Sequence, residues 1–280
     1  MNHKERAKLK DIPVSHHDPL SYAVEARDRS VIQMVNDALR HRHVRLAFQP
    51  VVTAIDPGRV AFYEGLIRVM DPTGRIIPAR DFINQVEETE AGRIIDCLSL
   101  EFGLKTLADQ PDLRLSINMS ARSIGYPRWM RTLKNGLKRD VTIAERLILE
   151  ITESSAMTVP ELVVNFMTEL QMEGISFALD DFGAGHTSFR YFKNFFFDVL
   201  KIDGEFIRNI HADPDNQAIT RAMVSIAKQF DMFTVAEFVE SEADARYLAS
   251  IGIDCLQGFY FGAPTIHPVW ETSSEKRART

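Results

Sequence analysis

Short apolar runs alternate with amphipathic segments along most of this chain. The runs are rich in β-branched and aromatic residues, which favours strands, and the segments between them carry apolar residues at helical spacing. We predict strands at 45–52, 60–69, 113–119, 147–151, 175–181, 197–202, 233–238 and 253–260. Eight strands interleaved with helices predict an α/β fold, a single barrel of the (β/α)8 type.

Helix starts and one short connection refine this picture. An apolar stripe predicts a helix over residues 21–42, and Pro160, Asp213 and Ser241 are typical of helix starts. The link between the first two strands, residues 53–59, is too short for a helix. We therefore predict a hairpin at this link, with the first two strands antiparallel.

Polar side chains close the predicted strands. The adjacent carboxylates Asp180 and Asp181 follow an apolar run, and an isolated pair of this kind would most often cap a helix or lie at the surface. Capping does not explain why acids, amides and a lysine recur at the other strand ends. Because the active site of such barrels lies at the carboxyl ends of the strands, we expect these side chains to converge there. The other polar residues of this kind are Glu64, which lies within its apolar segment, and Asn118, Glu150, Lys201, Glu237 and Gln257.

Composition limits the classes of partner and of compartment. The chain has 280 residues, 45% hydrophobic and 26% charged, as in globular soluble proteins. A net charge of −6 without a long basic run argues against a nucleic-acid polymer or an anionic membrane surface as partner. Two distant cysteines, Cys97 and Cys255, argue against disulfides and zinc. With neither a long apolar stretch nor a signal-peptide core, we expect no membrane insertion and a cytoplasmic location.

The donor atoms at the strand ends indicate a kind of metal. Each predicted ligand offers oxygen, which suits Mg²⁺ or Mn²⁺ better than zinc or copper. Six acids and amides exceed what one Mg²⁺ usually takes from protein, so we expect two ions about 3.5–4 Å apart. Two such ions clamp a phosphoryl group and activate water. The residues therefore predict metal-dependent hydrolysis of a phosphoester.

Eight stretches of the sequence together resemble a known family. In chain order they are FQPVV, YEGLIR, SINMS, LEITES, LDDFGAG, LKID, VAEFVE and LQGFYFGAP. Over residues 44–264 the chain resembles the EAL domain, the family of cyclic di-GMP phosphodiesterases. The resemblance implies a TIM-like barrel with one antiparallel strand, in agreement with the predicted hairpin. It also implies hydrolysis of cyclic di-GMP to linear pGpG.

The resemblance further implies which residues hold the two divalent cations. Asp180 would bridge the two ions, and Asp181 and Glu237 would complete the second. Lys201 would position the attacking water, and Glu237 would also serve as general base unless a metal-bound hydroxide suffices. Together with Asp180, the first ion would be held by Glu64, Asn118 and Glu150.

Two further groups of residues follow from the same resemblance. Arg68 would grip a substrate phosphate through its planar guanidinium, and Gln49 and Gln257 would contact substrate or bound water. A second group would orient the ligands and the loop after Asp181, although a helix cap or a surface acid explains two of its members, Glu153 and Glu240, almost as well. This second group is Glu153, Asp203 and Glu240.

Several positions depart from the family pattern. Gly65 replaces an alanine beside Glu64, which we expect to have a small effect. Phe238 stands where glycine is usual, so its ring would crowd the pocket or force a different backbone if that glycine has positive φ. Ala184 and His186 alter the loop after Asp181, which would change the ordering of the loop or dimer coupling.

Two functions therefore stay open. The first is an active cyclic di-GMP phosphodiesterase that uses two Mg²⁺ or Mn²⁺ ions. The second is a catalytically silent cyclic di-GMP receptor or protein-interaction module, which Phe238, Gly65 and the altered loop would favour. The aromatic run at 191–197 suits either barrel packing or a homodimer face, and an unidentified regulatory protein is a further possible partner. We expect one barrel domain at 21–270 between a mobile polar tail at 1–20 and a polar tail at 271–280.

Overall fold

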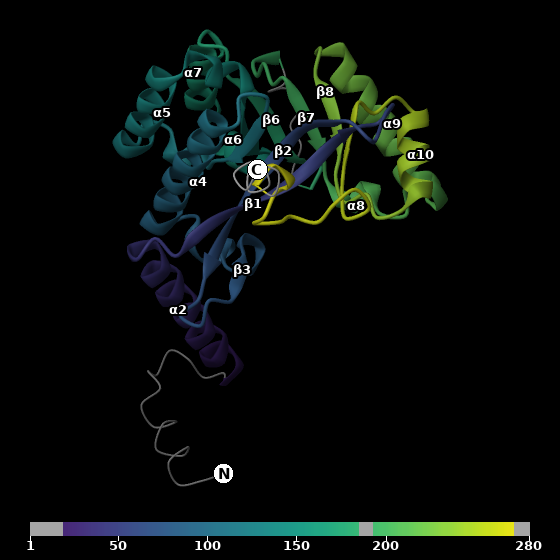
Figure 1. The fold of residues 1–280 in the computed structure, drawn as a ribbon. Helices are drawn as coiled ribbons and strands as arrows, with labels where there is room; N and C mark the ends of the chain where they lie inside the picture. Colours follow the sequence, from purple (N-terminus) through teal and green to yellow (C-terminus); the bar gives the residue numbers. More distant parts are fainter. Residues whose placement is uncertain (1–18, 185–192, 272–280) are drawn as a thin grey trace, which may run out of the picture.

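Eight strands close into a barrel in the computed structural model, which describes residues 19–184 and 193–271 (Figure 1). The ring order is β1-β9-β8-β7-β6-β5-β4-β2, and β2 pairs with β1 to close it. β1 is antiparallel to both neighbours, and the other pairs in the ring are parallel. This confirms the predicted TIM-like barrel with one reversed strand. The strands are β1 (Val44–Thr53), β2 (Val60–Met70), β4 (Leu115–Asn118), β5 (Leu147–Thr152), β6 (Ser176–Phe182), β7 (Val199–Ile202), β8 (Phe233–Ala236) and β9 (Cys255–Gln257).

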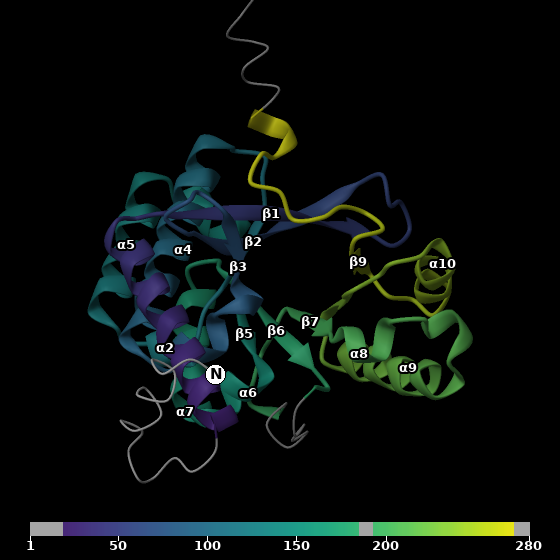
Figure 2. The same ribbon diagram turned by 90° about the horizontal axis from the view of Figure 1, so that it is seen from below.

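Helices cover the outside of the barrel. Figure 2 shows α4 to α7 on one side and α8 to α10 on the other. Two of the predicted starts are N-caps, since Asp213 accepts hydrogen bonds from the first turn of α9 and Ser241 accepts one from the backbone N–H of Asp244 in α10. The helices are α2 (Pro19–Arg40), α3 (Ile83–Val86), α4 (Glu90–Asp109), α5 (Pro127–Arg139), α6 (Glu153–Thr158), α7 (Pro160–Gln171), α8 (Gly204–Ile207), α9 (Pro214–Gln229) and α10 (Glu242–Ser250).

The β1–β2 pair extends past the ends of the parallel strands. The pairing of β4 with β2 ends where Ile117 lies opposite Gly65, whereas β2 continues to Met70. On this extension β2 pairs with a short strand, β3 (Ile76–Pro78), which the hydrophobic pattern did not predict. The 3₁₀ turn Ala79–Asp81 follows β3 directly. The extension therefore builds a wall beside the mouth of the barrel.

The apolar core has two parts. A large cluster lies between the strands and the surrounding helices, with Trp129, Phe177 and Leu115 fully buried within it. A second, smaller cluster draws residues from six barrel strands, and its inward alternation is that of a filled barrel. It consists of Val51, Phe62, Ile148, Ala178, Val199 and Val235.

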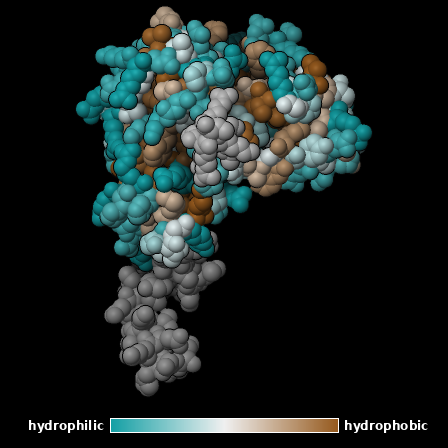
Figure 3. All heavy atoms as spheres, in the orientation of Figure 1, coloured by the Kyte–Doolittle hydropathy of each residue, from teal (hydrophilic) through white to brown (hydrophobic). Residues whose placement is uncertain are grey.

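The surface carries mainly hydrophilic residues on the face drawn in Figure 3, with apolar residues in scattered patches. Across residues 19–184 and 193–271, no helix is long and apolar enough to cross a membrane.

Candidate active site

The polar cluster lies one layer above the apolar filling of the barrel. Side chains on a strand alternate between its two faces, so residues two apart point to the same side. Phe62, Ile148, Ala178, Val199 and Val235 fill the barrel, and a charged residue follows each of them two positions later. These charged residues are Glu64, Glu150, Asp180, Lys201 and Glu237, and all five are buried.

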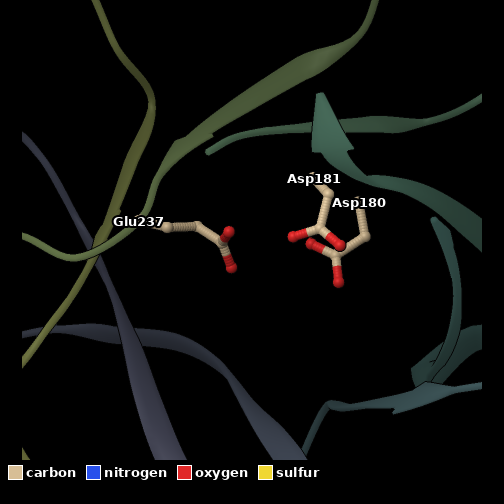
Figure 4. A group of neighbouring side chains, drawn as sticks. All are labelled: Asp180, Asp181 and Glu237. Carbon is tan, nitrogen blue, oxygen red and sulfur yellow. The ribbon is translucent and has the colours of Figure 1, made fainter. Parts of the chain in front are cut away.

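The pair Asp180 and Asp181 breaks the usual alternation. Adjacent strand residues should point to opposite faces, yet both carboxylates point toward Glu237, which faces them from the end of β8 (Figure 4). The cause is local: Asp181 has a φ of 54°, and the pairing of β6 with β7 shifts register between Leu179 and Phe182. Such an irregularity re-aims a side chain next to functional sites. It allows two neighbouring acids to serve one site.

Lys201 lies at the centre of the buried charged groups and contacts four carboxylates. Its Nζ lies 2.7 Å from Glu150 Oε2, 2.9 Å from Asp180 Oδ1 and 2.9 Å from Glu237 Oε1. Glu64 Oε2 is farther away, at 3.6 Å. Burial alone would lower the pKa of this ammonium, but the four carboxylates raise it well above its usual value. Lys201 is therefore charged and locks the carboxylates around it.

Glu64 is held ionised by two amides as well as by Lys201. Asn118 Nδ2 donates to Oε1 at 2.8 Å, and Gln257 Nε2 donates to Oε2 at 2.5 Å. Burial raises the pKa of Glu64, but the ammonium and the two amides outweigh it, so the pKa is lowered overall. Since Asn118 donates through its nitrogen, its carbonyl oxygen is left to act as a ligand.

The carboxyl groups of Glu150, Asp181 and Glu237 resist ionisation. Burial is the main cause in each case, and neighbouring carboxylates add to it against the opposing effect of Lys201. The pKa of Glu150 rises to about 8, that of Asp181 to about 6, and that of Glu237 rises well above its usual value. One ammonium among five carboxyl groups thus leaves the cluster short of positive charge.

The cluster fits hard divalent cations. Ligand oxygens of Asp180, Asp181 and Glu237 all lie within 4.8 Å of one another. In addition, Oε1 of the fully buried Glu150 has no hydrogen-bond partner among the described residues. An unsatisfied carboxylate oxygen in the interior is costly, and a bound cation would satisfy it. If all five carboxyl groups were ionised, Lys201 would leave four negative charges uncompensated, and two divalent cations would neutralise them.

A pocket of about 250 Å³ opens onto this cluster. The predicted substrate contacts Gln49, Arg68 and Gln257 all line it, and Gln257 Nε2 donates to Gln49 Oε1 at 3.3 Å. Arg80 and Phe259 also line the pocket, although neither was predicted as a site residue from the sequence. Arg80 follows the unpredicted strand β3, and nothing in its local sequence distinguishes it from a surface arginine.

The three residues expected to orient their neighbours lie in different settings. Glu153 is buried, and its Oε2 accepts a hydrogen bond from the backbone N–H of Gly183 at 3.2 Å, in the loop after Asp181. Asp203 caps α8 by accepting from the N–H of Glu205. Glu240 is exposed at the rim of the pocket.

The unusual residues of this chain have local explanations. A Cβ at position 65 would lie 2.7 Å from Ile117 Cδ1, so the isoleucine occupies the space that an alanine methyl needs. Phe238 has a φ of 53°, the conformation that glycine adopts freely. Its side chain lines the pocket and is 44% exposed. His186 and residues 191 and 192 of the aromatic run lie outside the described residues, as do the tails 1–18 and 272–280.

Comparison with known proteins gives a consistent result. The family model of the EAL domain matches residues 32–264. The chain is 32% identical over 256 residues to "Cyclic di-GMP phosphodiesterase PdeF" of Escherichia coli, covering 90% of this chain and 34% of that protein. It is 30% identical over 250 residues to the bifunctional diguanylate cyclase/cyclic di-GMP phosphodiesterase MucR of Pseudomonas aeruginosa, covering 86% and 36% respectively. The chain thus spans about a third of the length of these curated relatives.

Solved structures agree with the sequence comparison. The structure of the PaMucR phosphodiesterase in complex with c-di-GMP superposes with a TM-score of 0.74 at 29% identity, covering 87% of this chain and 99% of that one. The FimX EAL domain of Pseudomonas aeruginosa bound to c-di-GMP gives 0.76 at 26% identity, covering 84% and 96%. The chain therefore belongs to the EAL domain family.

Proposed function

We propose that this chain hydrolyses one phosphodiester bond of cyclic di-GMP, with linear pGpG as product. The observation that carries the proposal is the cluster of five carboxyl groups around Lys201, at the carboxyl ends of the barrel strands and open to a pocket. Relatives named as cyclic di-GMP phosphodiesterases, and a related phosphodiesterase solved with c-di-GMP, support the choice of substrate.

The proposed metal ligands fall into two sets, and the oxygens of Asp180, Asp181 and Glu237 already lie within 4.8 Å of one another. Glu64, Glu150 and Asn118 would hold one Mg²⁺ or Mn²⁺ ion together with Asp180, and Asp181 and Glu237 would hold a second. When bound, the two ions supply Lewis acidity for the phosphoryl group and for the attacking water. The raised pKa values of Glu150, Asp181 and Glu237 fit this assignment, since a cation would bring these carboxyl groups into their ionised form.

The residues of the chain would then handle the substrate and the proton. A water oxygen forms a bond to phosphorus while the bond from phosphorus to the 3′ oxygen breaks, and the leaving oxygen takes a proton from solvent. Glu237 would accept the proton of the attacking water, and Lys201 would hold Glu237 and Asp180 in place. Arg68 lines the pocket and would bind the phosphate oxygens of the substrate.

The direct test is turnover of cyclic di-GMP by the purified protein, with nucleotides resolved by chromatography. Mg²⁺, Mn²⁺ and Ca²⁺ are used in parallel, with EDTA as the metal-free reference. The Glu237→Gln variant keeps the size of the side chain but removes its charge, and Glu242→Gln, on the exposed surface of α10, is the matched control. We expect pGpG from the wild type and from Glu242→Gln, but not from Glu237→Gln.

The second candidate, a silent receptor, gives a different pattern. Phe238 in the pocket is the observation that favours it. A receptor would bind cyclic di-GMP in calorimetry yet form no more pGpG than Glu237→Gln with any of the three ions. A chain that neither bound nor hydrolysed the nucleotide would contradict both functions and leave protein contact as the role of the fold.

A further inference from the structure

Phe238 adopts a backbone conformation that its side chain disfavours. Its φ of 53° lies in the left-handed region, where residues with a Cβ pay a conformational cost. The chain is fixed on both sides of it, since Glu237 N–H donates to Ile202 O at 3.2 Å and Val239 N–H donates to Gln257 O at 2.9 Å. Such a conformation persists only when the surroundings enforce it.

The ring of Phe238 packs on the start of α8, and this contact helps to hold its backbone in the left-handed conformation. A Cβ at Gly204 would lie 2.6 Å from Phe238 Cγ and 2.8 Å from Phe238 Cβ, so the ring occupies the space of a side chain at position 204. The guanidinium carbon of Arg208 lies 4.3 Å from the centre of the ring, a close cation–π distance. Phe238 therefore contacts Gly204 and Arg208, which lie about 30 residues earlier in the sequence, at the two ends of α8.

This contact joins the two strand ends that carry Lys201 and Glu237. Gly204 comes three residues after Lys201, directly after the helix cap Asp203, and Phe238 comes directly after Glu237. Glu237 Oε1 and Lys201 Nζ are 2.9 Å apart. A glycine at position 238 would reach the same φ without help, whereas this chain reaches it with an aromatic ring held by a neighbouring element.

We propose that Phe238 is a positioning residue, which docks on Gly204 and Arg208 and thereby fixes the backbone that aims Glu237 into the acidic cluster. The docking of the Phe238 ring on Gly204 and Arg208 is argued from their contacts alone. The positioning of Glu237 as a metal ligand rests on the proposed function. In this interpretation Phe238 stabilises the site of this chain instead of obstructing it. Gly204 is then required because any larger side chain would displace the ring.

The docking is tested by a thermodynamic cycle of Gly204→Ala and Phe238→Gly. In the wild type the added methyl group overlaps the ring, and we expect a melting temperature lower by roughly 5 °C. In the Phe238→Gly background the same methyl group enters vacated space, and we expect almost no further loss. An equal loss from Gly204→Ala in both backgrounds would show that the ring does not dock there.

The positioning is tested by the affinity for Mn²⁺, measured by electron paramagnetic resonance at a temperature where all variants are folded. We expect Phe238→Ala, which keeps a Cβ at positive φ but removes the ring, to weaken Mn²⁺ binding about 10-fold, as for residues that orient metal ligands, and Phe238→Tyr to retain it. Phe233→Ala, at the exposed start of β8, is the matched control and should leave the affinity unchanged.

The outcomes separate this proposal from the proposed function. Unchanged Mn²⁺ affinity in a destabilised Phe238→Ala protein would reduce Phe238 to a packing residue and overturn the positioning role. A wild type without affinity for Mn²⁺ would contradict the metal-dependent function and the positioning role together. The melting cycle would even then decide whether the ring docks on Gly204.

Discussion

Removing the ammonium of Lys201 should destabilise the metal-free protein more than any exposed substitution. Lys201→Met keeps the length and the apolar stem of the side chain but leaves four buried carboxyl groups without their shared partner. Breaking a buried ion pair by removing one partner costs about 3–5 kcal/mol of unfolding free energy. For a chain of this size that loss corresponds to a melting temperature lower by roughly 10 °C.

The pH at which this loss appears follows from the titrating groups. The pKa of Lys201 is raised above its usual value, so its stabilising effect is fully present throughout the range from pH 5 to 8. The carboxyl groups change in this range, because the pKa of Glu150 is about 8 and that of Asp181 about 6. Lys201→Met should therefore cost most at pH 8, where unpaired carboxylates are ionised, and less at pH 5, where protonation relieves them.

The assay is thermal unfolding followed by circular dichroism, in EDTA and in Mn²⁺, for the wild type, Lys201→Met and Lys134→Met. Lys134 is exposed on α5, so the same chemical change should alter the unfolding free energy by less than about 0.5 kcal/mol. Mn²⁺ should restore part of the loss in Lys201→Met, since it supplies positive charge to the same carboxylates. A loss below about 1 kcal/mol at pH 8 in EDTA would refute the view of Lys201 as the internal counter-ion.

Three further predictions concern pH, packing and substrate. The metal-free wild type should become less stable as the pH rises from 5 to 8, by an amount on the order of 4 kcal/mol of unfolding free energy. Burial raises the pKa of Glu150 to about 8, so the folded protein holds a proton that the unfolded chain releases in this range. Melting temperatures in EDTA that stay level or rise with pH would contradict this. Gly65→Ala should lower the unfolding free energy by about 1–3 kcal/mol through the clash with Ile117 Cδ1, and adding Ile117→Val should recover part of it, as a double-mutant cycle would measure. Arg68→Met should raise the KM for cyclic di-GMP about 10-fold with little change in kcat. The control Arg75→Met, at an exposed arginine, should leave both constants unchanged. A fall in kcat alone would argue against phosphate binding by Arg68.

The barrel could be predicted from the sequence because its elements are strongly patterned. Buried strands and helices of different period alternate along the chain, and the short 53–59 link fixed the direction of β1 without any knowledge of the fold. The convergence of Glu150 and Glu237 was also predictable, since each lies near the end of an apolar run and parallel strands end on one face, whereas Glu64 lies in the middle of β2.

Other features depend on register and on pairs that are distant in sequence. β3 has only three residues and shows no periodicity, so the wall that carries Arg80 was not predicted. The expected strand at 233–238 ends at Ala236, because the left-handed backbone of Phe238 ends the pairing. From the sequence alone, the ring of Phe238 was expected to crowd the pocket or to change the local backbone. That the ring fills the space beside Gly204 could not be predicted, because the two residues are distant in sequence and meet only in the folded barrel.

The reversal of β1 also decides where the chain enters the barrel. Val44 opens β1 and pairs with Val69 near the carboxyl end of β2, so the helix α2 leads into the fold at the rim of the pocket and not at its base. From that rim only four residues of extended strand separate Val44 from Gln49, which receives a hydrogen bond from Gln257, itself a donor to Glu64. The shortest path from α2 to the acidic cluster therefore runs along one extended strand and two amide side chains.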